Sequence, residues 1–174
     1  MNINTLPTGK EAPSDIYAFI EIAALGSVKY EPDHESGFMF VDRFLHTQMT
    51  YPTNYGSIPQ TKSDDGDEMD VLVVTEIPVQ PSTVIRCRPI GVIKMEDESG
   101  MDEKIIAVPH TKINPYYNDV EEVEDLPEIL RKKIEHFFTH YKDLEPNKWV
   151  KVQGWGSSAD AKKLIEEGMA RYKA

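Results

Sequence analysis

An acidic run occupies residues 64–70, where five of the seven residues are carboxylic acids, and it leads directly into the apolar segment 71–74. Two carboxylates held about 5 Å apart repel each other by roughly 3 kcal/mol at an effective dielectric constant of about 20. Ligand sets made only of oxygen select hard cations, so the run is a candidate site for Mg²⁺, Mn²⁺ or Ca²⁺. Considered alone, it is equally compatible with a solvated acidic turn.

The spacing of these acids does not fit the calcium loop of an EF-hand, because position six, counted from Asp65, is Asp70 where that loop needs glycine. In an extended chain Asp65 and Asp67 point to the same side, and Asp70 joins them after a small kink. A second pair, Asp97 and Asp102, adds carboxylates for more than one ion. Two or more Mg²⁺ ions together would activate a water molecule and neutralise a phosphoryl group.

Chemistry on a phosphoryl group also needs cations, and candidates are spread along the chain. Lys104 lies two residues after Asp102 and therefore on the same face of a strand. Arg43 has apolar neighbours, and a buried arginine needs an anionic partner, for which an ordinary Asp or Glu is the alternative to a phosphate. The other polar candidates are Lys29, Glu31, Tyr55, Tyr141 and Lys142.

Other reactive side chains show no catalytic spacing. His136 and His140 lie four residues apart, but without an HExxH pattern we interpret them as packing or surface residues. Cys87 is the only cysteine, which excludes an intrachain disulfide and a cysteine-based zinc site. The sequence has no GxSxG, GxGxxG or GxxxxGK[ST] motif, so neither a hydrolase triad nor an organic cofactor is indicated.

The bulk composition limits the partners. With 30 acidic against 19 basic residues and a net charge of −11, the chain has no dense basic surface, so nucleic acid is not an expected partner. We find neither a signal-peptide pattern nor an apolar stretch of membrane-spanning length, so we expect a cytoplasmic protein with no membrane partner. A length of 174 residues suits a single domain, residues 1–174.

The elements that must position these residues are mainly strands. Alternating apolar patterns with β-branched residues predict strands over residues 16–22, 28–31, 38–44, 71–75, 84–95, 104–108 and 149–152. Residues 51–56 read as a rigid loop, and 97–102 as a hairpin connection. Asp125 is a predicted cap for a helix that ends near Lys142, and a second helix is predicted over residues 158–172. We therefore expect an α+β fold, mainly β, in which helices pack on a small closed sheet.

Residues 65–73, Asp-Gly-Asp-Glu-Met-Asp-Val-Leu-Val, closely resemble the DGDPxDVLV signature of the soluble family I inorganic pyrophosphatases, and in particular their bacterial type. Further similar segments lie between about residues 13 and 155, at 29–31, 40–43, 51–56, 85–91, 97–104, 108–109 and 136–142. The resemblance implies a five-stranded closed β-barrel of OB-like shape with the two C-terminal helices packed against it. It also implies hydrolysis of inorganic pyrophosphate to two orthophosphates with several Mg²⁺ ions, for which Mn²⁺ is a substitute, in a homohexamer.

The same resemblance assigns roles by motif. Asp67 is the implied general base for a metal-activated water, with no covalent intermediate. The implied metal ligands are Glu31, Asp65, Asp70, Asp97 and Asp102. The implied catalytic and substrate-binding groups are Lys29, Arg43, Tyr55, Lys104, Tyr141 and Lys142.

Three positions depart from the family pattern. Glu68 replaces a proline, Ser57 stands where an aromatic residue often follows Tyr-Gly, and the altered segment 22–27 leaves Glu21 without an assigned role. Two non-catalytic alternatives also use the same residues. One is an OB-like binding module in which the acids are simply solvated, and the other is a Ca²⁺-binding structural protein.

Overall fold

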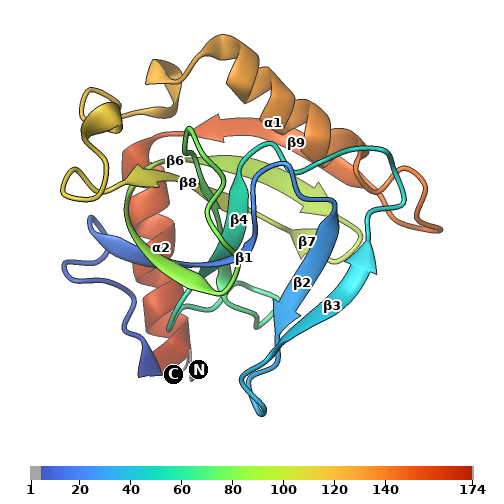
Figure 1. Cartoon of the computed structure of the whole chain (residues 1–174), viewed down its shortest axis with the longest axis horizontal. Coiled ribbons are helices and arrows are strands. Elements are labelled where there is room, and N and C mark those ends of the chain that lie inside the picture. The colour runs from blue at the N-terminus through green and yellow to red at the C-terminus, as the bar shows by residue number, and fades with distance from the viewer. Residues whose placement is uncertain (1–4, 174) are drawn as a thin grey trace.

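The computed structural model describes residues 5–173, a mainly β structure with two α-helices in that part of the chain (Figure 1). The strands are β1 (Ile16–Ile22), β2 (Val28–Pro32), β3 (Met39–Phe44), β4 (Asn54–Ile58), β5 (Met69–Val73), β6 (Thr83–Asp97), β7 (Gly100–Met101), β8 (Lys104–Pro109) and β9 (Val150–Gly156). The helices are α1 (Glu128–His140) and α2 (Ser158–Lys173), with short 3₁₀ helices η2 (Pro115–Tyr117) and η3 (Val123–Asp125).

Five strands pair in a ring. Strand β4 lies antiparallel between β1 and β5, β8 runs parallel to β5, and β6 pairs antiparallel with both β8 and β1. The long strand β6 also carries β7 and β9. Strands β2 and β3 form a separate two-stranded sheet, which projects at the lower right of Figure 1 and is called the arm below. The ring has no free edge, so its strands are held on both sides.

The two faces of β5 show how the helices attach. Leu72 belongs to the hydrophobic cluster that contains Phe137 and Phe138 of α1, whereas Val71 belongs to the cluster that contains Ile165 of α2. Successive side chains of a strand point to opposite faces, so an uninterrupted apolar run serves both clusters. Burial of each such side chain contributes about 1.5–3 kcal/mol. The strand that follows the acidic run is therefore fixed on both sides.

The predicted strands correspond to β1, β2, β3, β5, β6, β8 and β9, and the two predicted helices to α1 and α2. The prediction of a loop over residues 51–56 was wrong at its second half, because Asn54–Ile58 is the fully buried strand β4. Its sequence lacks the usual alternation. Gly56 instead allows close approach to β1, since a Cβ atom there would lie 1.9 Å from the carbonyl oxygen of Phe19.

Two local predictions were also wrong. Asp125 does not cap α1, which begins after Pro127, but accepts hydrogen bonds at 2.9 Å from the backbone N–H groups of Glu121 and Glu122 around η3. The acidic run is not extended before β5, because it turns at Gly66 with φ +98°. The predicted hairpin connection at 97–102 is confirmed, and Gly100 has φ +124° there.

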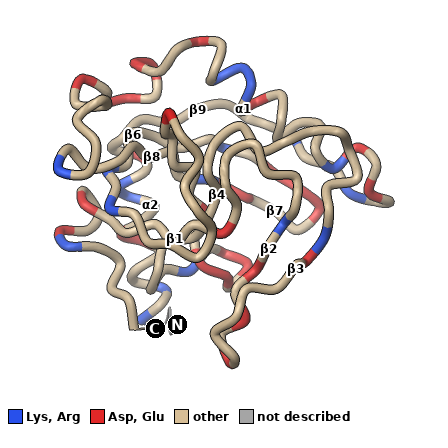
Figure 2. Tube along the Cα trace, in the orientation of Figure 1, with Lys and Arg blue, Asp and Glu red and all other residues tan. Residues whose placement is uncertain are grey.

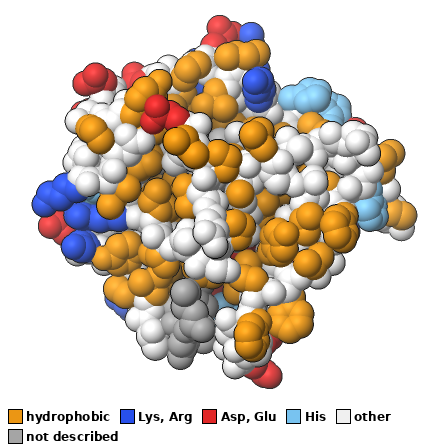
Figure 3. Space-filling model, in the orientation of Figure 1, with side chains coloured by type: hydrophobic (Ala, Val, Ile, Leu, Met, Phe, Trp, Pro, Cys, Tyr) orange, Lys and Arg blue, Asp and Glu red, His pale blue; other side chains and the backbone are white. Residues whose placement is uncertain are grey.

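The arm exposes apolar side chains. Phe38, Phe40, Val41 and Phe44 are all exposed, and Figure 3 shows apolar side chains gathered on the part of this face where β2 and β3 lie. Exposed apolar patches of this kind mark interaction sites in many proteins. Neither of the helices in residues 5–173 is long and apolar enough to span a membrane.

Candidate active site

All twelve site residues that were singled out in the sequence line one cleft of about 460 Å³. They come from separate elements that the ring, the arm and the end of α1 bring together. They are Lys29, Glu31, Arg43, Tyr55, Asp65, Asp67, Asp70, Asp97, Asp102, Lys104, Tyr141 and Lys142.

The ring supplies one wall of the cleft, called the sheet wall and made of Tyr55, Asp70, Asp102 and Lys104. The Lys104 side chain is only 3% exposed, and its Nζ donates hydrogen bonds to Asp70 and, at 2.7 Å, to Oδ1 of Asp102. Burial alone would lower the pKa of Lys104, but the two carboxylates outweigh this effect and raise it. The sheet wall therefore holds a fixed positive charge between two acids.

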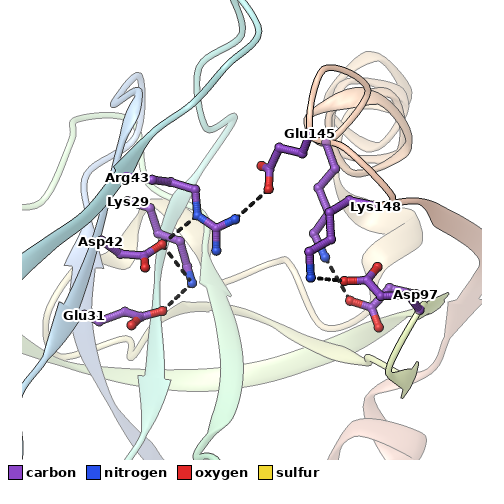
Figure 4. A network of polar contacts seen from close by, with 9 residues as sticks. Lys29, Glu31, Asp42, Arg43, Asp97, Glu145 and Lys148 are labelled. Carbon is purple, nitrogen blue, oxygen red and sulfur yellow. Dashed lines mark hydrogen bonds and ion pairs between the residues drawn. The ribbon is translucent and has the colours of Figure 1, made fainter.

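The arm supplies a second wall of the cleft, lined by Lys29, Glu31 and Arg43. Together with Asp42, which contacts Arg43, these residues are called the arm wall. Lys29 and Arg43 are cross-strand partners in β2 and β3, and Figure 2 shows basic and acidic positions side by side on these strands. Lys29 contacts Glu31 and lies 3.7 Å from Asp42. Arg43 Nε donates to Asp42 at 2.6 Å (Figure 4). Each cation of this wall already has a carboxylate partner.

The end of α1 and the loop after it close the cleft between these walls. Lys142 Nζ donates to Asp97 at 2.8 Å. Arg43 Nη1 donates to the buried Glu145 at 2.6 Å (Figure 4). Burial alone would raise the pKa of Asp97, but the hydrogen bond from Lys142 helps to hold it below its usual value. Tyr141 stacks on Phe137 of α1 with ring centroids 5.1 Å apart. The helix end thus presents a phenol and an ammonium group to the cleft.

The acidic loop between β4 and β5 carries Asp65 and Asp67. The backbone N–H of Asp67 donates to Asp65 Oδ1 at 3.1 Å, and the Asp67 carbonyl accepts from Ser63 N at 2.8 Å. Partial burial raises the pKa of Asp67, and the charges of Asp65 and Glu31 raise it further. A carboxylate with raised proton affinity beside other acids suits the role of a general base.

The donor chemistry fits hard divalent cations, but the ligands are not gathered in advance. Among residues 5–173, no three acidic, histidine or cysteine side chains lie close enough together to form a metal site. Three of the proposed ligands have a lysine partner instead: Asp70 and Asp102 contact Lys104, and Asp97 contacts Lys142. Carboxylate oxygens around a polar cleft remain the ligand set that Mg²⁺ prefers. Ammonium groups hold three of these acids in the metal-free protein.

Four further residues line or support the cleft, and the sequence assigned no site role to any of them. Asp42 and Glu145 are the partners of Arg43, while Glu21 and Ser57 form a buried pair in which Ser57 Oγ donates to Glu21 at 2.6 Å. Glu21 is 7% exposed, and burial raises its pKa to about 8. An acid inside the apolar strand 16–22 was the available signal, because a carboxyl group is buried only at a cost.

Comparisons with known proteins identify the family. The family model for inorganic pyrophosphatase matches residues 18–173, nearly the whole chain. The chain belongs to the inorganic pyrophosphatase family. Inorganic pyrophosphatases of Aquifex pyrophilus and Rhodospirillum rubrum are 55% and 56% identical to this pyrophosphatase, and the matches cover 99% and 100% of it and 98% of each relative.

Solved structures give the same result. The inorganic pyrophosphatase of Thermus thermophilus matches with a TM-score of 0.96 at 38% identity, covering 100% of both chains. The enzyme of Helicobacter pylori matches with a TM-score of 0.94 at 44% identity, covering 98% of this chain and 99% of the other. The protein is thus a metal-dependent enzyme that hydrolyses inorganic pyrophosphate. The two non-catalytic alternatives are not favoured.

Proposed function

We propose that this pyrophosphatase cleaves pyrophosphate into two orthophosphates with Mg²⁺ as its metal and Asp67 as general base. The convergence of all twelve candidate residues on one cleft carries this proposal. Water attacks one phosphorus, its proton passes to a carboxylate oxygen of Asp67, and the bond from that phosphorus to the bridging oxygen breaks. The second phosphate leaves with the bridging oxygen. No protein nucleophile is needed, so no covalent intermediate forms.

The tightest ion would be held by Asp65, Asp70 and Asp102, and Asp70 would also serve a second ion. Asp97 and Asp102 would hold an ion that arrives with the substrate, and Glu31 would help to hold another. When bound, these ions supply charge neutralisation and lower the pKa of the attacking water. Mn²⁺ has the same preference for oxygen ligands and is the expected substitute.

The substrate is held by cations from all sides of the cleft. Lys29 and Arg43 bind from the arm wall, and Lys104 and Lys142 bind from the other side. Arg43 offers a planar fork that matches phosphate oxygens, whereas each lysine acts as a point charge. Tyr55 and Tyr141 add phenol hydroxyl groups. Substrate binding then exchanges carboxylate partners for phosphoryl oxygens.

We further propose that the five-strand ring is a closed barrel of OB-like shape within a single domain, residues 1–174. The pairings that lead from β1 back to β1 support this description. A homohexamer is the proposed assembly, and the exposed apolar face of the arm supports a contact between subunits. A cytoplasmic location is also proposed. The excess of 11 negative charges supports an enzyme that does not bind nucleic acid.

Phosphate release from pyrophosphate tests the metal dependence directly. Removal of Mg²⁺ with a chelator should lower turnover at least about 100-fold, since the ions activate the attacking water. Asp70→Asn should raise the Mg²⁺ concentration needed for half-maximal rate, while Glu68→Gln, which removes a neighbouring charge with no proposed ligand role, is the matched control. Metal-independent turnover of pure folded protein would sink the proposal.

A further inference from the structure

The last turns of α2 hold the neck of the acidic loop. At this neck, residues 61–63, the backbone N–H of Lys62 donates to the carbonyl oxygen of Gly168 at 3.0 Å. The carbonyl oxygen of Lys62 in turn accepts from Arg171 Nε at 2.8 Å. Both polar groups of one residue's backbone are therefore bound by the same helix. Few surface loops are held in this way, because their backbone groups usually face water.

The same arginine reaches further into the loop. Arg171 Nη1 lies 3.3 Å from Oδ1 of Asp64, the residue directly before Asp65. A guanidinium group presents several N–H donors in a rigid plane, so one side chain can fix a carbonyl oxygen and a carboxylate together. Asp64 is 74% exposed, so the ion pair alone is weak and the hydrogen bond to Lys62 is the larger contribution. Asp64, which has no metal or base role, is here a contact of the helix.

The helix also touches the far end of the loop. A Cβ atom on Gly168 would lie 2.3 Å from Met69 Sδ and 3.3 Å from the carbonyl oxygen of Lys62. Glycine at this position lets α2 pack closely against the residues on both sides of the acids. The helix therefore sets where the loop leaves the sheet and where it returns at β5.

Hydrogen bonds inside the loop connect the neck, residues 61–63, to the proposed base Asp67. Ser63, next to Lys62, donates its N–H to the carbonyl oxygen of Asp67 at 2.8 Å, and Met69 N donates to Thr61 Oγ1 at 3.1 Å. A shift of the neck therefore moves the backbone of Asp67 with it. A misplacement of about 1 Å in a catalytic group can cost up to about 100-fold in rate.

We propose that Arg171 is a positioning residue of this enzyme, which fixes the acidic loop through Lys62 and Asp64. The inference rests on the proposed roles of Asp65 and Asp67 in that loop. Arg171 is not needed to attach the helix, because Ala161 and Ile165 of α2 are fully buried in the core. Its removal should loosen the loop and leave the fold intact.

The test compares Arg171→Ala with Lys163→Ala as a control on the same helix. The ammonium group of Lys163 lies 3.8 Å from Glu167 on the exposed surface. In the metal-free protein, Arg171→Ala should speed hydrogen exchange of the amides of residues 62–68 by about tenfold, with α2 and β5 unchanged. In the enzyme assay, kcat should fall about 3- to 10-fold and half-saturating Mg²⁺ should rise, with KM for pyrophosphate little changed. Lys163→Ala should change none of these quantities.

A second variant, Asp64→Asn, keeps the hydrogen bond to Lys62 and should give a smaller change of the same sign. Unchanged exchange at residues 62–68 in both variants would overturn the proposal. Faster exchange throughout α2 and β5 would also overturn it, because Arg171 would then support the whole fold. Faster exchange at residues 62–68 with wild-type kcat and Mg²⁺ dependence would overturn it too, because the role of Arg171 would be purely structural. The exchange experiment needs no metal or substrate, so its result is separate from that of the Asp67 assignment.

Discussion

The sheet wall and the arm wall carry similar charged groups in different surroundings. Lys104 is 3% exposed and lies between two acids beside strands of the closed ring. Lys29 is 25% exposed and its partner Glu31 is 52% exposed, on a sheet of only two strands. Removing one partner of a buried ion pair strongly destabilises the protein, because the other charge stays buried without a partner. Removing one partner of an exposed pair changes protein stability little.

This difference assigns separate tasks to the two walls. The sheet wall holds its charges in place before substrate arrives, which is the arrangement that stabilises developing negative charge most effectively. In the arm wall, Lys29 pairs with Glu31, which is 52% exposed, and we propose that phosphoryl oxygens of the substrate replace this partner (Figure 4). Stability should therefore depend on the sheet wall, and substrate affinity on the arm wall.

Replacing one lysine in each wall gives the largest expected contrast. Lys104→Met leaves Asp70 and Asp102 without their cation, and should lower the unfolding free energy of the metal-free protein by about 3–5 kcal/mol. Lys29→Met, the matched change in the arm, should lower it by less than about 1 kcal/mol. Urea denaturation at pH 7 measures both values. Equal losses in the two variants would break the distinction between the walls.

The buried carboxyl group of Glu21 should make the unfolding free energy depend on pH. Its pKa in the folded metal-free protein is raised from 4.5 to about 8, so between these values the folded state binds a proton that the unfolded state has lost. Stability therefore falls as pH rises, by about 1.4 kcal/mol per unit, or about 3 kcal/mol from pH 5 to pH 7. Glu21→Gln should remove that contribution.

The measurement is the difference in unfolding free energy between wild type and Glu21→Gln at each pH, which cancels the other titrating groups. A pH-independent difference would show that Glu21 is ionised in the folded protein. The buried strand β1 would then tolerate a charge at this position, contrary to the raised pKa that burial gives Glu21.

Arg43 should show a smaller effect on stability than Lys104 and a clear effect on substrate binding. Arg43→Ala should lower kcat/KM about 10- to 100-fold and lower the unfolding free energy by about 1–3 kcal/mol, because Arg43 is 36% exposed but its partner Glu145 is only 7% exposed and loses its cation. Arg43→Lys should recover only part of the loss, since a lysine lacks the planar fork. Steady-state kinetics with urea denaturation checks both. A loss of stability as large as that of Lys104→Met would contradict the exchangeable character of the arm wall.

The site was predictable from sequence to the extent that its residues lie in short motifs. Residues 65–73 and 97–104 carry local patterns, and the cleft contains all of the acids they contribute except Glu98. The long-range ion pair between Arg43 and Glu145 was not predictable, because these residues are 102 positions apart and meet only through the fold. The same holds for the contact of Arg171 with the loop neck, which joins residues 109 positions apart.

The fold was predictable where apolar alternation is strong, as in β1 and β6. Strand β4 was missed because its residues make specific contacts and show no apolar alternation. Asn54 donates to the carbonyl oxygen of Val73 at 3.0 Å, and Gly56 leaves room for the backbone of Phe19. A closed sheet was expected, but which strands pair in it was beyond local patterns, because the pairing of β1 with β6 joins distant segments. Tertiary contacts of this kind override the propensity of a short segment.

The assignment of Asp67 as general base is tested most directly by the pH dependence of kcat. The measurement compares wild type with Asp67→Asn at saturating Mg²⁺ and pyrophosphate, with Glu68→Gln as the matched control. We expect Asp67→Asn to lower kcat by about 100- to 1,000-fold and to remove the acidic limb of the profile, because the amide cannot accept the proton. A variant that keeps both the acidic limb and a turnover within a few-fold of wild type would contradict the account.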